Sequence, residues 1–411
     1  MRVLVVGAGA REHALVRALW LDPAVAEVWC APGNAGIADD ASCRPVDVTD
    51  ADAVAAVAVD VGADLVVVGP ETALVAGAAD AVRARGVDCF GPSASAARLE
   101  GSKAFAKDVM AAAGVPTARA VVCNTAAEVG AALDGFAPPY VVKDDGLAAG
   151  KGVVVTRDRD EASRHAAGCG RVVVEEFLDG PEVSLFAVTD ARTVVPLQPA
   201  QDFKRVGDGD TGPNTGGMGA YSPLPWAPAG LVDEAVATVL QPTVDELARR
   251  GTPFAGLLYA GLALTSSGLR VIEFNARFGD PETQVVLARL RSPLGQLLRA
   301  AATGRLAEAA PLEWSEDAAV TVVVAAAGYP TAPRLGGVVS GLDVAAKSPG
   351  ALVLHAGTAV DAHGNVVAAG GRVLSVVGTG PTVAAAREAA YDAVACVQLE
   401  GSHYRTDIGC R

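Results

Sequence analysis

The sequence predicts a multidomain protein of mixed α/β and α+β class, with an N-terminal parallel α/β domain, a larger central domain and a small C-terminal α+β domain. Three observations lead to this prediction. The 411 residues exceed one typical domain of roughly 150 residues. Short apolar runs alternate with amphipathic stretches at the start of the chain, and strand-like runs dominate its end. We expect domain boundaries at 1–100, 101–317 and 318–411.

Composition and charge exclude several classes of protein. The formal net charge of −14 has the wrong sign for general binding to a nucleic-acid backbone. No apolar run approaches the ~18 residues of a membrane span, and the start of the chain lacks the long apolar region of a secretory signal. The seven cysteines are scattered without a C-x-x-C pair, so we expect reduced thiols. We therefore expect a soluble cytoplasmic protein whose partners include neither nucleic acid nor a membrane.

Residues 1–100 predict a parallel sheet flanked by helices. The apolar and amphipathic runs are Arg2–Val6, Glu12–Trp20, Glu27–Cys30, Asp64–Val68, Ala73–Arg85 and Asp88–Phe90. Glycine-rich turns follow strands at Gly7–Ala10, Gly33–Gly36, Gly69–Glu71 and Gly91–Pro92. Ligands of open α/β sheets bind beyond the carboxyl ends of the strands, so these turns predict a binding edge.

The first turn, Gly7-x-Gly9-x-x-Glu12, matches the dinucleotide fingerprint only in part. Glu12 stands where the third glycine belongs, and no acidic residue ends the second strand. A nicotinamide site and a tight turn without a ligand both stay open. The amides of a helix N-terminus, with Arg11 beside them, favour a phosphate such as that of a phosphorylated sugar. His13 is more typical of a packing residue.

The central domain predicts a helix, a β-rich region and a second helix. We expect helices over Gly101–Ala113 and Leu231–Arg249, and strands over Tyr140–Lys143, Gly152–Thr156, Arg171–Glu176, Val183–Val188, Gly256–Leu264 and Leu269–Phe274. A polar, glycine-rich stretch, Gln201–Ser222, lies between the strands. The first two strands, joined by a glycine loop, predict a flap.

The loop Gly146–Gly152 resembles a phosphate-binding loop but is not a Walker motif. Its glycines are separated by three residues where the Walker pattern has four, and Gly152 replaces the Ser/Thr that binds Mg²⁺. A strand follows, so a hairpin loop with Gly150 and Lys151 would close over phosphates, and Lys143 would reach them from the incoming strand. A plain turn is the alternative.

Glu175, Glu176 and Leu178 follow a valine-rich run. Two solvated acids are one interpretation. In a nucleotide cleft, this segment would instead present backbone groups to adenine, and Glu182 would meet the ribose hydroxyls.

The string Val271–Thr283 is more informative. Alternation along a strand puts Glu273 and Asn275 on one face, roughly 6.6–6.8 Å apart along the chain. Hard oxygen ligands with this spacing suit Mg²⁺, which usually takes one or two carboxylates together with phosphate oxygens. Arg277 lies just beyond, suited to a substrate carboxylate or a transferring phosphoryl group. A solvated strand end would explain the acids alone.

The end of the chain predicts a small α+β domain. Its expected elements are strands at Ala319–Ala326, Val338–Ser340, Ala351–Leu354 and Gly371–Val377, and a helix from Thr382 to about Val397.

Eight segments carry a resemblance to a known family: Gly7–His13, Gly33–Gly36, Gly69–Glu71, Leu99–Lys103, Lys143–Gly152, Gln201–Asp208, Thr211–Tyr221 and Ile272–Thr283. In order and spacing they resemble the phosphoribosylamine–glycine ligases of the ATP-grasp superfamily, and the resemblance extends to Asp407–Gly409. It implies an N-terminal substrate domain, an ATP-grasp core with a mobile flap at about 121–183, and a small C-terminal domain. Asp144 stands where the family commonly has alanine, so we expect it to face solvent, away from the phosphates.

The resemblance also implies an ATP-dependent carbon–nitrogen ligase of de novo purine synthesis. It would join glycine to 5-phospho-D-ribosylamine through glycyl phosphate, giving glycinamide ribonucleotide, ADP and phosphate. ATP and Mg²⁺ would be the cofactors, with Mn²⁺ able to substitute, and we expect a monomer. Such chemistry depends on positioning and electrostatics, so no Ser, Cys or His nucleophile is needed.

The expected site residues form four groups. The catalytic residues would be Arg277, Lys143 and Lys204. The nucleotide would contact Lys103, Lys143, Gly150, Lys151, Gly152, Glu175, Glu176, Leu178 and Glu182. The metal would be held by Glu273 and Asn275. The substrates would contact Gly9, Arg11, Asn34, Gly36, Glu71, Asp202, Asn214, Arg277 and Asp280.

Other functions stay open from the sequence. A related ATP-grasp carboxylase would use bicarbonate in place of glycine. An NAD-dependent dehydrogenase would explain only residues 1–36. A non-catalytic nucleotide-binding regulator would not need paired metal ligands beside an arginine.

Overall fold

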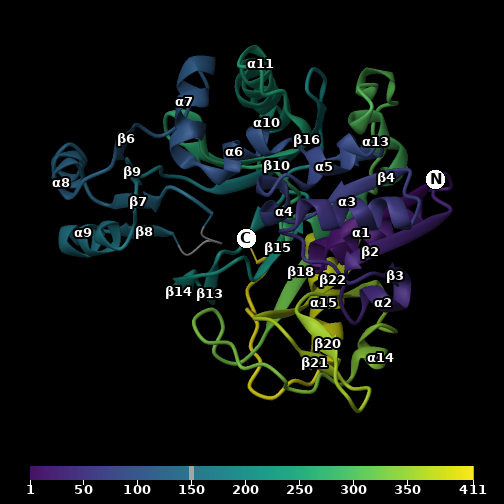
Figure 1. Cartoon of the computed structure of the whole chain (residues 1–411). Coiled ribbons are helices and arrows are strands. Elements are labelled where there is room, and N and C mark those ends of the chain that lie inside the picture. The colour runs from purple at the N-terminus through teal and green to yellow at the C-terminus, as the bar shows by residue number, and fades with distance from the viewer. Residues whose placement is uncertain (148–151, 411) are drawn as a thin grey trace.

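The computed structural model describes residues 1–147 and 152–410. The N-terminal, flap and C-terminal elements surround the central strands of the chain (Figure 1). The N-terminal sheet lies at the right of this view, the flap at the left and the C-terminal elements at the bottom. Within the described residues, no helix combines the length and apolar character that a membrane crossing requires.

Five parallel strands form the N-terminal sheet, in the order β3-β2-β1-β4-β5. The strands are β1 Arg2–Gly7, β2 Glu27–Pro32, β3 Ser42–Cys43, β4 Leu65–Val68 and β5 Asp88–Phe90. The helices are α1 Ala10–Trp20, α2 Ile37–Asp40, α3 Ala51–Asp60, α4 Glu71–Val75 and α5 Ala78–Ala84. The inner strands β1 and β4 are valine-rich and buried on both faces, as parallel sheets require. The predicted parallel α/β domain is confirmed.

The boundaries of some elements differ from the sequence prediction. The stretch predicted as one run, Ala73–Arg85, is two helices, because Gly77 adopts a φ of +91° that ends α4 and precedes α5. The helix predicted over Gly101–Ala113 begins at Lys103, where the Ser102 hydroxyl caps it by accepting from the Phe105 amide. That helix is α7, Lys103–Ala113, and α6, Ala94–Gly101, precedes it. Helix α3 was not predicted.

The flap is a four-stranded antiparallel sheet of order β6-β9-β7-β8, with helices α8 and α9. These elements are β6 Ala120–Cys123, α8 Ala126–Asp134, β7 Tyr140–Asp144, β8 Val153–Thr156, α9 Arg159–Ala167 and β9 Val172–Glu175. The expected pairing across the glycine loop is confirmed, with Lys143 opposite Val153. The flap has its own apolar core, which includes Leu133, Val142 and Val174. It is therefore packed as a unit separate from the main body.

The central sheet has the order β11-β10-β16-β17 and is antiparallel. Its strands are β10 Glu182–Asp190, β11 Val194–Pro196, β16 Ala255–Thr265 and β17 Gly268–Asn275. The predicted helix Leu231–Arg249 is continuous, formed by α10 Leu231–Ala235, a π-helical turn Val236–Leu240 and α11 Gln241–Arg249. Helices α12 Glu282–Arg289 and α13 Leu294–Ala302 and the 3₁₀ turn Leu306–Glu308 follow β17.

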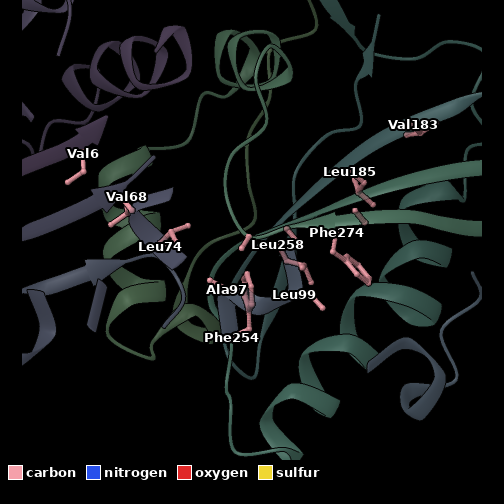
Figure 2. Close-up of a cluster of buried hydrophobic side chains, with 14 of the residues drawn as sticks. Val6, Val68, Leu74, Ala97, Leu99, Val183, Leu185, Phe254, Leu258 and Phe274 are labelled. Atoms are coloured by element: carbon pink, nitrogen blue, oxygen red, sulfur yellow. The ribbon is translucent and has the colours of Figure 1, made fainter. Parts of the chain in front are cut away.

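One apolar cluster joins the N-terminal sheet to the central sheet. Figure 2 shows Val6 and Val68 of the N-terminal strands and Leu185, Leu258 and Phe274 of the central strands in the same cluster. Burial removes roughly 1.5–3 kcal/mol of unfavourable hydration for each large apolar side chain, so this shared core strongly favours one fixed arrangement of the two sheets. The cleft walls that these sheets supply are therefore preformed.

The C-terminal sheet has the order β12-β15-β18-β22-β19. Its strands are β12 Gln201–Asp202, β15 Gly219–Ser222, β18 Ala318–Ala325, β19 Ala351–His355 and β22 Arg372–Gly380. Helices α14 Leu342–Ala345 and α15 Val383–Cys396 and a small β20–β21 pair, Thr358–Val360 with Val366–Ala368, complete this part. A separate hairpin, β13 Arg205–Gly207 with β14 Thr211–Asn214, precedes β15. Because β12 and β15 come from the middle of the chain, this sheet crosses the expected boundary at residue 317.

The predicted strand Val338–Ser340 is wrong. Val338 and Ser340 form only isolated bridges, to Val367 and Gln398 respectively. The valines of this segment match the residue preference of a strand, but its two ends pair with different segments, so no continuous ladder of hydrogen bonds forms.

A matched pair of glycine substitutions tests the packing of α15 on the C-terminal sheet. A Cβ at Gly378 of β22 would lie 2.1 Å from Ala386 O and 2.4 Å from Ala390 N, both in the helix backbone. We expect Gly378→Ala to lower the free energy of unfolding by about 1–3 kcal/mol, because the helix must move outward. Gly130→Ala in α8 meets nothing within 4 Å and should stabilise by about 0.5–1 kcal/mol. Urea unfolding of both variants measures the effects, and equal stability of the two would contradict the close approach.

Candidate active site

One large cleft, of about 650 Å³, opens between the flap, the central sheet, the N-terminal domain and the C-terminal sheet. The sequence-predicted residues that line it are Arg11, Glu71, Lys103, Lys143, Gly152, Glu175, Glu176, Leu178, Glu182, Asp202, Lys204, Asn214, Glu273, Asn275, Arg277 and Asp280. Gly9, Asn34 and Gly36 lie outside its lining. Gly150 and Lys151 lie outside the described residues.

Three lysines enter the cleft from α7 and β7. The Glu175 carboxylate, 3% exposed, lies 3.0 Å from Lys143 Nζ and 3.3 Å from Lys107 Nζ. Lys143 also donates to Ile272 O at 2.9 Å, and Lys103 donates to Gly146 O at 2.8 Å. Burial, only partly offset by nearby carboxylates, lowers the pKa of Lys103 and of Lys107. Cations outnumber carboxylates at this point, which suits an anionic ligand such as a polyphosphate.

Strand β17 delivers Glu273 and Asn275 to the cleft, as the alternation predicted. Burial acts to raise the pKa of Glu273, but the ammonium groups of Lys204 and Lys143 outweigh it, and the pKa lies below its ordinary value. Glu273 is therefore ionised at neutral pH and available to a cation.

A second acid stands near this pair. Glu282, the first residue of α12, is 4% exposed, and its Oε1 accepts from Ser184 Oγ at 3.0 Å. Ser184 Oγ also lies 3.0 Å from the hydroxyl of Tyr259, which is the cross-strand partner of Asn275. This hydrogen-bonded chain links β10, β16 and α12 beside Glu273.

Asp202, at the end of β12, and Lys204, two residues further on, face the same part of the cleft. Burial, together with the nearby Glu282 and Glu182 carboxylates, raises the pKa of Asp202 to about 7, although the Lys204 ammonium opposes this. Burial alone would lower the pKa of Lys204, but the Asp202 and Glu182 carboxylates raise it. Lys204 Nζ lies 2.8 Å from Glu182. Glu182 therefore contacts an ammonium group in this structure.

The donor set fits a hard divalent cation that shares a phosphorylated ligand. Among the described residues, no group of three or more His, Cys, Asp or Glu side chains forms a complete metal cage. Glu273 and Asn275 supply two hard oxygen ligands, and Mg²⁺ commonly needs no more from the protein when phosphate oxygens and water complete its shell.

Arg277 ties the end of β17 to the N-terminal domain. Its guanidinium lies 3.0 Å from Glu71 and 3.2 Å from Glu100. Burial would raise the pKa of Glu71, but Arg277 and Arg11 hold it at about 2. Despite burial, the two carboxylates raise the pKa of Arg277. A substrate carboxylate at Arg277 would therefore share or displace an existing ion pair.

The first glycine turn differs from its expected role. The Glu12 carboxylate accepts from the Gly9 amide at 2.6 Å, so the amide expected to face a phosphate is already capped. Arg11 is 7% exposed, pairs with Glu12 at 2.5 Å and lies 3.8 Å from Glu71. Arg11 therefore lines the cleft with its guanidinium close to the Glu12 and Glu71 carboxylates.

Asp280 forms an ion pair with an arginine of the C-terminal sheet. Arg372 donates to Gly216 O at 2.6 Å and to Asp280 O at 2.8 Å, and its guanidinium lies 3.0 Å from Asp280 Oδ2. Through these contacts the C-terminal sheet meets the central part of the chain at the cleft.

Asn34 and Gly36 join the N-terminal domain to the C-terminal sheet. Asn34 Nδ2 donates to Ala8 O at 2.8 Å and His355 O at 2.9 Å, and its Oδ1 accepts from the Gly36 amide at 3.0 Å. A Cβ at Gly36 would lie 2.4 Å from the His355 ring. His13, predicted as a packing residue, is 2% exposed and accepts from the His355 amide at 2.9 Å. These residues form a domain junction.

The rim of the cleft holds the remaining predicted residues. Glu176 accepts from the Arg119 amide at 2.8 Å, and Leu178 and Gly152 line the opening. Asp144, expected to face solvent, is half-buried. Burial, together with the Asp144 carboxylate, raises the pKa of Cys169, which places Asp144 near that thiol.

The sequence analysis gave no role to several cleft residues, among them Lys107, Glu282 and Arg372. Lys107 lies one helical turn after Lys103, so its spacing was a usable signal. Glu282 belongs to the informative string but was given no role. Arg372 carries no local signal, because only the tertiary fold brings β22 to Asp280.

Comparison with known proteins gives the family. The models of the phosphoribosylglycinamide synthetase N domain, ATP-grasp (A) domain and C domain match residues 1–100, 101–283 and 319–411. The chain belongs to the phosphoribosylglycinamide synthetase family. It is an ATP-grasp ligase of purine biosynthesis that uses ATP and a divalent metal.

Relatives of this ligase match over the full length. The phosphoribosylamine–glycine ligases of Streptomyces coelicolor and Mycobacterium tuberculosis are 68% and 59% identical, covering 100% of this chain and 99% and 98% of their own. The crystal structure of phosphoribosylamine–glycine ligase from Thermotoga maritima superposes with a TM-score of 0.85 at 34% identity, covering 99% of this chain and 100% of that chain. The biotin carboxylase domain of a Hydrogenobacter thermophilus 2-oxoglutarate carboxylase, at 16% identity and a TM-score of 0.73 over 98% of this chain and 91% of that one, shares the fold.

The domain junction predicts a dependence of the ligase's stability on pH. Burial and the neighbouring His13 lower the pKa of His355 to about 4, so the folded state holds this ring neutral. The unfolded chain gains a proton as pH falls below about 6.5, so stability is lost between about pH 6.5 and 4, by up to about 3 kcal/mol. We expect His355→Gln to flatten this part of the unfolding profile measured with urea.

His363→Gln, at an exposed loop position, is the matched control and should leave the profile unchanged. An equally steep loss of stability on acidification in His355→Gln would remove His355 as its source.

Proposed function

We propose that this ligase joins glycine to 5-phospho-D-ribosylamine, forming glycinamide ribonucleotide, ADP and phosphate through glycyl phosphate. The observation that carries the proposal is the cleft itself: lysines around Glu175, the Glu273 carboxylate at a strand end and a buried arginine, all in a chain whose three parts match one family. The sequence identity of 68% over the full length to a ligase of that name supports the choice of substrates.

We assign the flap side of the cleft to ATP. Lys103 and Lys143 lie where they can contact the phosphates, and Lys143 is held in place by Glu175 and the Ile272 carbonyl. The glycine loop, with Gly150, Lys151 and Gly152, would cover the phosphates, while Glu176, Leu178 and Glu182 would meet the adenine and ribose.

We assign the metal, Mg²⁺ with Mn²⁺ able to substitute, to Glu273 and Asn275, with Glu282 nearby. Bound there, the cation would offset charge on the phosphate oxygens during phosphoryl transfer. Glu273 supports this role because its pKa is lowered, which keeps a negative charge at the strand end.

Glycine would occupy the space among Arg277, Lys204, Asp202 and Asn214. One oxygen of its carboxylate attacks the γ-phosphoryl group of ATP, ADP leaves, and the mixed anhydride glycyl phosphate forms. Lys143 and Arg277 would offset the developing charge. The guanidinium of Arg277 is already oriented by Glu71 and Glu100, so it is held in place before the substrate arrives.

The amine of phosphoribosylamine then attacks the carbonyl carbon of glycyl phosphate, phosphate leaves with the bridging oxygen, and the amine loses a proton. We assign Arg11, Glu71 and Asp280 to the ribosyl phosphate side, with Arg372 as an additional cation there. Gly9, whose amide is capped by Glu12, would let the turn approach Asp280 closely. Asn34 and Gly36 would act by holding the domain junction.

We further propose a division into domains at residues 100 and 317, a monomer, and a cytoplasmic location. The N-domain match ends at residue 100 and the C-domain match begins at residue 319, close to the two proposed boundaries.

Glu273→Gln tests the metal assignment. The change keeps the side-chain volume and removes the charge, so kcat/KM for metal–ATP should fall by about a hundredfold or more. Steady-state ADP release at several Mg²⁺ concentrations measures the effect. Glu27→Gln, which alters an ion-paired strand carboxylate remote from the cleft, should behave as wild type. Full activity of Glu273→Gln at low Mg²⁺ would exclude Glu273 as a ligand.

Isotope transfer tests the reaction. With ¹⁸O in the glycine carboxylate, the released phosphate should carry one ¹⁸O per turnover, because the attacking oxygen leaves with phosphate. Mass spectrometry of the phosphate detects it, and bicarbonate in place of glycine should give no ADP. Turnover without ¹⁸O in phosphate would rule out glycyl phosphate, and bicarbonate-dependent ADP release would favour a carboxylase.

A further inference from the structure

The β13–β14 hairpin lines the cleft but belongs to no larger sheet. Arg205, Asp210 and Asn214 of this segment face the cleft, yet its two strands pair only with each other. An isolated two-stranded hairpin is marginally stable in water, so other contacts must hold it in place.

Those contacts come from the end of the chain. Arg405 is 1% exposed, and its Nη1 donates to Asp210 Oδ1 at 2.8 Å and to Arg205 O at 3.2 Å. Its Nε and Nη2 donate to the two carboxylate oxygens of Asp407 at 2.7 and 2.6 Å. The Arg405 guanidinium thus joins the first residue of β13, Arg205, and the turn residue Asp210 to the C-terminal segment.

The tip of the hairpin makes a second set of contacts with that segment. Asp208 Oδ1 accepts from the Thr406 amide at 2.8 Å, and the Gly209 amide donates to Asp407 Oδ2 at 2.9 Å. In Figure 1 the hairpin projects below the flap, beside the point where the chain ends.

The C-terminal segment is itself anchored to α15. Arg387 donates to Ile408 O at 3.1 Å and to Thr406 O at 2.6 Å, and the Tyr391 hydroxyl donates to Arg405 O at 2.6 Å. Ile408 is fully buried. Because α15 packs on β18 and β22, the hairpin is connected through Arg405 to the rigid C-terminal sheet.

Arg405 also reaches the segment 202–204, which carries two cleft residues. Its guanidinium carbon lies 4.8 Å from the centre of the Phe203 ring. Asp202 and Lys204, on either side of Phe203, line the cleft, whereas Phe203 does not. The arginine therefore supports the back of a segment whose front faces the substrates.

We propose that the C-terminal segment Arg405–Ile408 positions the substrate wall of the cleft, residues 202–214, and that Arg405 is the positioning residue for the ligase reaction. The inference rests on the proposed function in one respect, the assignment of this wall to glycine. Replacing Arg405 removes the hydrogen bonds and ion pairs that join Asp210 and the Arg205 carbonyl to Asp407, so the hairpin loses these connections to the C-terminal segment.

The test compares Arg405→Met with Arg405→Lys and with Arg334→Met, an exposed arginine of the same domain. In Arg405→Met, kcat/KM for glycine should fall by about tenfold or more while the KM for ATP changes by less than about twofold. Arg405→Lys keeps the charge but not the planar fork, so it should restore activity only in part. Arg334→Met should match wild type.

Hydrogen exchange followed by mass spectrometry supplies a readout that does not depend on the reaction. Peptides covering 202–214 should exchange faster in Arg405→Met, while those of the N-terminal sheet should not change. Asp208→Ala, at an exposed tip residue outside the cleft lining, should shift glycine kinetics and hairpin exchange in the same direction but less. This variant decides the question if Arg405→Met does not fold.

Glycine-dependent activity of the wild-type protein separates a failure of the proposed function from a failure of the proposed positioning by Arg405. If wild type lacks glycine-dependent ADP release, the proposed function fails, and hairpin exchange alone still tests the positioning. If wild type is active, unchanged glycine kinetics and unchanged exchange at 202–214 in Asp208→Ala and in folded Arg405→Met would overturn the proposal. An equal loss for ATP and glycine with faster exchange throughout the chain would also overturn it, because that is general destabilisation.

Discussion

The pairing of buried cationic side chains with buried carboxylates at the cleft constrains the arrangement of the rest of this structure. Arg277 is held by Glu71 of α4 and Glu100 of α6, so one guanidinium joins β17 to the N-terminal domain. Glu175 plays the same part for the flap, because its carboxylate holds Lys143 of β7 and Lys107 of α7. A buried ion costs several kcal/mol unless it is paired, so each pair holds its elements in a fixed arrangement.

Apolar packing divides the molecule differently from these ion pairs. The N-terminal and central sheets share one core, whereas the flap has a core of its own. The flap therefore meets the body chiefly at polar groups, including the Lys143 contact with the Ile272 carbonyl. Polar contacts of this kind can exchange for contacts with a ligand at little net cost, which a shared apolar core does not allow.

The C-terminal part completes the cleft from outside the ATP-grasp core. Arg372 reaches Asp280 and the Gly216 carbonyl, and Arg405 supports the β13–β14 hairpin. Arg372 lies far in sequence from Asp280 and Gly216, and Arg405 lies far in sequence from Arg205 and Asp210. Strands β12 and β15, from the middle of the chain, extend the C-terminal sheet, so Asp202 at the cleft and the domain behind it belong to one hydrogen-bonded layer.

Local periodicity and turn chemistry were enough to predict the parallel N-terminal sheet, the flap hairpin and the strand that carries Glu273 and Asn275. The bond from Asn34 to the His355 carbonyl and the contacts of Arg372 and Arg405 at the cleft depend instead on tertiary packing. Those contacts join residues whose neighbours in sequence carry no matching pattern. Their energies arise from burial and charge pairing, which exist only once distant segments have packed together.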